Sequence, residues 1–140
     1  MIGRVLDSSA LIHWARQSSP YVNAIVFSRA KHPGYIVPVV TTAPAVTVAL
    51  AQLPASAVPI LDALIGMEIC LVDDLTPSSA PGVAEVLQVV GPYAAEHLLT
   101  AASIVQAARR RNIPVTTSNP YPLTELASRL GIELETDPIP

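Results

Sequence analysis

Charged side chains are scarce in this 140-residue chain, where they make up 14% of the residues against 51% that are apolar. Such a composition excludes a disordered chain and predicts one domain with a large buried core. It also predicts apolar surface that a partner can cover. The net charge of −3 supplies no general attraction to a nucleic-acid backbone.

Cysteine is nearly absent as well. Cys70 is the only one, so no disulfide can form within the chain, which suits a reducing compartment and predicts a cytoplasmic protein. Its neighbours in the run 68–72 are mostly apolar, and we therefore expect a buried structural thiol. The first seven residues already include Arg4 and Asp7, and no apolar core of signal-peptide length is present there.

No charge at all occurs between residues 33 and 61. The stretch 34–53 alone is long enough to span a bilayer. Prolines interrupt the uncharged segment 33–61, however, at Pro38, Pro44, Pro54 and Pro59. We expect a buried strand and two short helices here, and no membrane insertion.

Strands and helices are expected to alternate along the chain. Apolar runs predict strands at 4–7, 35–37, 69–72 and 114–117, and alternation predicts an edge strand at 132–135. Helical patterns and caps predict helices at 9–17 (capped by Ser8 or Ser9), from Pro20 onward (capped by Ser19), and at 40–52, 56–66, 76–90, 93–111 and 122–130. Strands joined by helical crossovers predict a three-layer α/β/α sandwich with a mostly parallel central sheet. The expected domain is 1–136, with a frayed tail at 137–140.

Motifs near both ends of the chain resemble those of one family. Near the start an aspartate and two hydroxyls follow a strand, in the run Val5-Leu6-Asp7-Ser8-Ser9-Ala10-Leu11. Open α/β sheets bind ligands at this end of their strands. Near the end, residues 101–109 precede the run Pro114-Val115-Thr116-Thr117-Ser118-Asn119-Pro120. Together these motifs resemble the PIN-domain ribonucleases, the family of VapC-type toxins, over essentially the whole chain, and the resemblance implies a PIN-like fold.

The resemblance also implies RNA cleavage by about four clustered acids that hold Mg²⁺ or Mn²⁺. Asp7 matches the first acid, and Ser9 and Thr117 match supporting hydroxyls. The other three acid positions fall on Pro44, Thr100 and Asn119, and no carboxylate within 33–61 can replace Pro44. One carboxylate cannot hold two divalent ions about 4 Å apart. We therefore expect no bound metal, with Asp7 as the ligand if there is one.

Other charged residues allow two interpretations each, one functional and one structural. Glu96 lies one helical turn before Thr100. It either reaches the cluster of matched acid positions or complements a helix N-terminus. Asp73 and Asp74 resemble the acidic pair of phospho-receiver domains, but Lys31 is the only lysine and follows no closing strand, so a solvated loop is expected. The three arginines at 109–111 either contact RNA or complement a helix C-terminus.

These observations favour a degenerate PIN-like protein, catalytically impaired, that acts as a protein-binding or dimerisation module without a cofactor. The alternative is a Mg²⁺- or Mn²⁺-dependent ribonuclease of the toxin–antitoxin type that uses Asp7 with Glu96 and Asn119. A homodimer is the expected assembly, an antitoxin-like or DNA-binding protein is a second candidate partner, and RNA would bind only an active enzyme. The partner surface is expected on the first two helices, at Leu11, Trp14, Tyr21, Val22 and Val26, and on the long helix near Leu98, Leu99 and Ile104.

Overall fold

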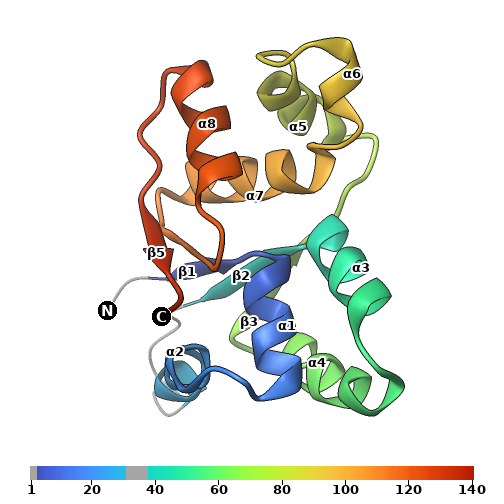
Figure 1. Cartoon of the computed structure of the whole chain (residues 1–140), viewed down its shortest axis with the longest axis vertical. Coiled ribbons are helices and arrows are strands. Elements are labelled where there is room, and N and C mark those ends of the chain that lie inside the picture. The colour runs from blue at the N-terminus through green and yellow to red at the C-terminus, as the bar shows by residue number, and fades with distance from the viewer. Residues whose placement is uncertain (1–2, 31–37) are drawn as a thin grey trace.

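A five-stranded, all-parallel sheet forms the centre of the protein (Figure 1). The computed structural model describes residues 3–30 and 38–140. The strand order is β3-β2-β1-β4-β5. In chain order the strands are β1 (Arg4–Leu6), β2 (Val39–Thr42), β3 (Cys70–Asp73), β4 (Val115–Thr117) and β5 (Thr136–Pro138).

Helices cover both faces of the sheet (Figure 1). One layer holds α1 (Ser8–Arg16), α2 (Pro20–Ala30), α3 (Ala43–Gln52), a 3₁₀ turn (Ala55–Ala57) and α4 (Val58–Ile65). The other holds α5 (Ala80–Leu87), α6 (Pro92–Ala95), α7 (Leu99–Arg111) and α8 (Tyr121–Leu130). Right-handed crossovers explain the division, because the chain adds strands in one direction as far as β3 and in the other direction afterwards. The predicted three-layer α/β/α sandwich is confirmed.

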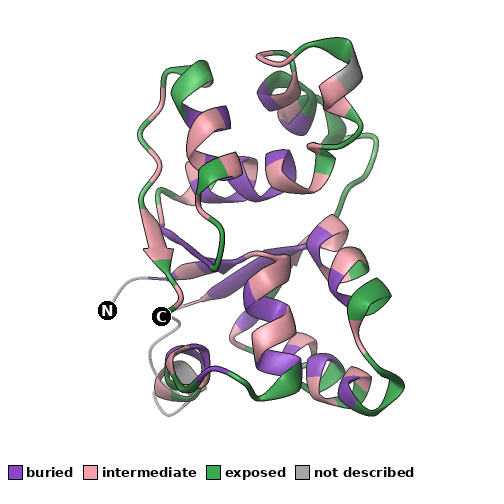
Figure 2. Cartoon of the chain, viewed as in Figure 1, coloured by how far each residue is buried: buried purple, intermediate pink, exposed green. Residues whose placement is uncertain are grey.

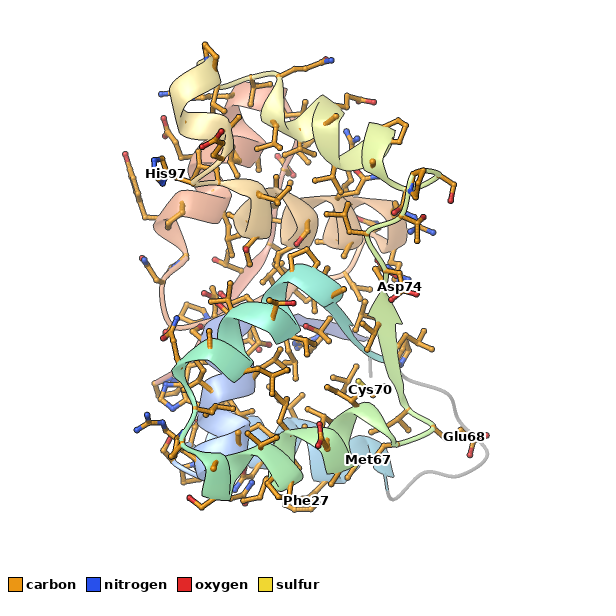
Figure 3. The ribbon with its side chains drawn as sticks, turned by 90° about the vertical axis from the view of Figure 1, so that its right-hand side faces the viewer. Phe27, Met67, Glu68, Cys70, Asp74 and His97 are labelled. Carbon is orange, nitrogen blue, oxygen red and sulfur yellow. The ribbon has the colours of Figure 1, made fainter. Side chains whose placement is uncertain are left out.

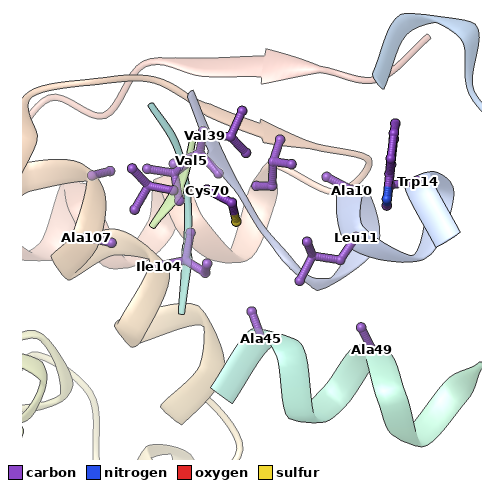
Figure 4. Packing of buried hydrophobic residues seen from close by; sticks show 14 of the residues in the cluster. Val5, Ala10, Leu11, Trp14, Val39, Ala45, Ala49, Cys70, Ile104 and Ala107 are labelled. Atoms are coloured by element: carbon purple, nitrogen blue, oxygen red, sulfur yellow. The ribbon is translucent and has the colours of Figure 1, made fainter. Parts of the chain in front are cut away.

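The core lies between the sheet and the helices of both layers, as the buried colouring of the strands and the inward helix faces shows (Figure 2). On one side Ile104 and Ala107 of α7 pack near the strands, and on the other side the core residues come from α1 and α3 (Figure 4). Small residues such as Ala45 and Ala49 are fully buried where α3 contacts α1. Burying a Val or Leu side chain in such a core contributes about 1.5–3 kcal/mol relative to exposure.

Several element boundaries differ from the predictions. Residues 40–42 belong to β2 and not to a helix, because the run from Val39 to Thr42 is β-branched and Thr42 caps α3. The strand predicted at 35–37 lies outside the described residues. The long helix predicted over 93–111 is divided into α6 and α7, and the helix predicted from 76 begins at Ala80.

The prediction for the C-terminus was wrong. The alternating residues 132–135 are not a strand, and the segment expected to be frayed supplies β5, which pairs with β4. Asp137 accepts hydrogen bonds from Arg4 Nε at 3.2 Å, from Thr116 Oγ1 at 3.1 Å and from the Tyr21 hydroxyl. The Ile139 amide donates to the Thr117 carbonyl at 2.9 Å. These bonds order residues 136–139 although their sequence has little β propensity.

The partner surface predicted on the first two helices was also wrong. Leu11, Val22 and Val26 are fully buried, and Trp14 is 3% exposed with its indole N–H bonded to the Ile60 carbonyl at 3.0 Å. Tyr21 is partly buried against Asp137. The apolar stripes of α1 and α2 therefore pack within the chain. None of the helices within the described ranges is long and apolar enough to cross a membrane.

Candidate functional site

The sequence-predicted site lies where the direction of strand addition changes, between β1 and β4. Asp7 directly follows β1, and Thr117 ends β4. β1 and β4 are parallel neighbours, so both residues lie at the carboxyl edge of the sheet. In open α/β sheets this switch point is the usual position of a ligand crevice.

Both oxygens of the Asp7 carboxylate accept hydrogen bonds from the protein itself. Its Oδ1 accepts from the Ser9 hydroxyl at 2.6 Å and from the Ala10 amide at 3.0 Å, which makes Asp7 the N-cap of α1. Its Oδ2 accepts from the Thr117 hydroxyl at 2.5 Å. Asp7, and not Ser8 or Ser9, is therefore the cap, because a carboxylate satisfies the free amides and complements the dipole at this helix end.

The two hydroxyls that bind Asp7 also tie down the loop after β4. The Ser118 amide donates to Ser9 Oγ at 2.9 Å, and the Asn119 amide donates to Thr117 Oγ1 at 3.0 Å. Ser9 and Thr117 thus each accept from this loop while donating to the same carboxylate. The result is a closed hydrogen-bond network that joins α1 to β4 and to the loop leading to α8.

At the neighbouring strand, β2, two buried hydroxyls lie against each other. Thr42, at the end of β2, accepts from the Ala45 amide at 3.2 Å and caps α3. Its hydroxyl lies 2.8 Å from that of Ser103 in α7, which donates to the Thr100 carbonyl at 2.6 Å. Thr42 and Ser103 are 1% and 4% exposed. Sequence analysis missed Ser103, because a serine inside a helical pattern carries no signal of its own.

The Asp7 network offers one carboxylate to a divalent metal ion. Mg²⁺ and Mn²⁺ prefer carboxylate oxygens, and Asp7, whose two oxygens already accept three hydrogen bonds, is the one acid in the network. No group of three His, Cys, Asp or Glu residues gathers anywhere in the described ranges. Glu96 is exposed in the connection between α6 and α7, and Asn119 is exposed after β4.

A cavity of about 280 Å³ opens beside this network, at the carboxyl ends of β2 and β3. Pro44, Thr42 and Ser103 form its wall toward the sheet. Its other walls come from α5, α7 and the loop after β3. Of the residues proposed from sequence for the acid positions, Pro44 alone lines it, so the open space lies next to the switch point and not in it.

Most of the arginine cluster is engaged within the protein. Arg111 binds Asp73 through two hydrogen bonds of 2.6 and 2.7 Å, and this hydrogen bonding raises the pKa of Arg111. Arg109 binds Glu85 at 3.1 Å and the Gly82 carbonyl at 3.4 Å. Asp73 is therefore not solvated as predicted, whereas Asp74 is exposed. Arg110, 55% exposed, is the accessible member of the cluster.

Comparison with protein-family models and with curated proteins gives no match.

Proposed function

We propose that this protein is a catalytically impaired PIN-like domain of the VapC type that acts as a protein-binding and dimerisation module. The observation that supports the proposal best is the state of Asp7. It is the one acid among the four matched positions, and its carboxylate caps α1 and binds Thr117. Two-metal hydrolysis needs several carboxylates to hold its ions, and Pro44, Thr100 and Asn119 supply none.

The proposed partner is a second copy of this chain, on a surface that includes Leu98 but none of the residues predicted on the first two helices. An apolar groove of about 350 Å³ lies between α6 and α8, with Leu98 and Leu126 in its lining. Tyr121, 71% exposed, stands at the start of α8 and also lines the groove. An exposed aromatic beside an apolar groove is typical of interfaces.

Charge favours a copy over an unrelated partner. Glu125 and Arg129 line the same groove and form an ion pair of 2.9 Å along α8. In a two-fold arrangement with antiparallel α8 helices, Glu125 of each copy can face the opposite charge of the other, so the surface is complementary to itself.

A cytoplasmic location fits the unpaired thiol of Cys70.

Light scattering, which measures the mass of the assembly, tests the proposed dimer. We expect about twice the 14.7 kDa chain mass at micromolar concentration. Tyr121→Arg should give monomer, and Leu50→Arg, which changes a 39% exposed leucine of α3, should leave the dimer intact. A wild-type monomer, or a dimer that both variants retain, would contradict the proposed interface. Metal-dependent ribonuclease activity lost in Asp7→Asn would support the alternative enzyme.

A further inference from the structure

The cavity at the ends of β2 and β3 has both apolar and polar walls. Pro44, Leu75 and Val83 supply apolar surface, and Ser78 and Ser79 supply hydroxyls. Gly82 permits this shape, since a Cβ there would meet Gln106 Nε2 of α7 at 2.4 Å. The cavity is thus bounded by a close approach of α5 to α7.

The charged residues that line this cavity, Asp73, Asp74 and Arg110, differ in how closely they are paired. Asp73 is paired with Arg111 through two short hydrogen bonds. Arg110 also lines the cavity and forms a longer ion pair with Asp73, with 3.7 Å between its Nη1 and Asp73 Oδ2, a distance at which no hydrogen bond forms. Asp74 lines it as well, at the exit of β3 toward α5 (Figure 3), and forms no ion pair within the described residues. The Asp74 carboxylate is therefore available to a ligand, and Arg110, 55% exposed, can donate hydrogen bonds to one because its ion pair with Asp73 is long.

We propose that this cavity binds a small zwitterion, a free α-amino acid with an apolar side chain. Its carboxylate would bind Arg110, whose planar guanidinium matches a carboxylate with two hydrogen bonds. Its ammonium group would bind Asp74, and its side chain would lie against Pro44, Leu75 and Val83. A ligand of one charge satisfies one of these groups and is repelled by the other, whereas a zwitterion satisfies both.

The volume agrees with this class of ligand. A cavity of about 280 Å³ lies at the lower end of the range for small-molecule sites, which suits a ligand as small as a free amino acid. None of the residues that line it donates to Asp7. Binding of an amino acid in this cavity therefore depends neither on dimerisation nor on whether Asp7 binds a metal ion.

The first experiment measures the melting temperature of the full chain with each of the twenty amino acids at about 10 mM. Leucine, methionine or valine should raise it by about 5 °C, as a ligand in tenfold excess over its Kd does for a domain of this size. The methyl ester and the N-acetyl derivative of the best amino acid should each lose this effect. No rise with any amino acid, or an N-acetyl derivative as effective as the free amino acid, would overturn the proposal.

Variants locate the site. Arg110→Gln and Asp74→Asn should each weaken binding of the best amino acid at least tenfold in calorimetric titration, because each removes one charged partner. The matched controls Arg16→Gln and Asp62→Asn change exposed charges on α1 and α4, away from the cavity, and should bind as the wild type does. Unchanged binding in both cavity variants would overturn the assignment.

Discussion

Replacement of Asp7 by alanine should destabilise the metal-free protein strongly. The substitution removes the N-cap of α1, which typically costs about 1 kcal/mol. It also removes the charged acceptor of the Ser9 and Thr117 hydroxyls, and hydrogen bonds to charged groups contribute about 1.5–3 kcal/mol each. Because Asp7 is only half-buried, water can replace part of these bonds, and we expect a total loss of about 3 kcal/mol.

For a chain of this length that loss lowers the melting temperature by about 10 °C. Asp7→Asn retains an acceptor for the Ala10 amide and should cost about 1 kcal/mol. Urea unfolding followed by circular dichroism, with EDTA present, measures both values. Asp62→Ala, which removes an exposed carboxylate of α4, is the matched control and should change stability by less than about 0.5 kcal/mol.

An Asp7→Ala variant as stable as the wild type in EDTA would contradict a capping role for Asp7. A carboxylate kept free to bind metal would behave in that way, since its removal breaks no bond of the metal-free fold. A graded loss, with alanine well below asparagine and the control unchanged, would show that Asp7 is a structural cap.

Two other parts of the structure give simple predictions. Burial raises the pKa of the Cys70 thiol to about 11, so the thiol stays protonated at pH 8; a thiol reagent should react slowly with the native protein and rapidly in urea, and equal rates would contradict the burial. Asp137→Ala should lower the unfolding free energy by about 2 kcal/mol, because Arg4, Tyr21 and Thr116 lose their common acceptor; an unchanged urea midpoint would mean that β5 contributes nothing to stability.

The sequence predicts the sheet and most helices because their signals are local. Apolar runs mark β1, β3 and β4, and Gly131, with a φ of 78°, ends α8. β5 has no such signal, since Thr136–Pro138 is held in place by side chains from β1, α2 and β4. Its order depends on contacts between residues more than a hundred positions apart, such as Arg4 and Asp137.

The candidate site could be located from the sequence, but its internal bonding could not. Asp7 and the loop after β4 lie together at the carboxyl ends of β1 and β4, positions that apolar runs followed by polar residues indicate. Whether a carboxylate binds a metal or caps a helix depends on the donors around it, and Thr117 lies 110 positions away. The partner surface failed for a related reason, since periodicity shows that α1 and α2 have apolar stripes but not that the chain itself covers them.

The melting temperature with and without millimolar Mn²⁺ or Mg²⁺ tests the central claim most directly. A ligand that binds only the native state stabilises it by RT ln(1 + [L]/Kd), which is about 2.7 kcal/mol at a hundredfold excess over Kd. With Asp7 engaged as a cap and no second acid beside it, we predict a change below about 1 °C after EDTA treatment. A rise of several degrees with Mn²⁺ or Mg²⁺, abolished by Asp7→Asn, would contradict the proposal of a catalytically impaired protein. It would favour the alternative, a metal-dependent ribonuclease.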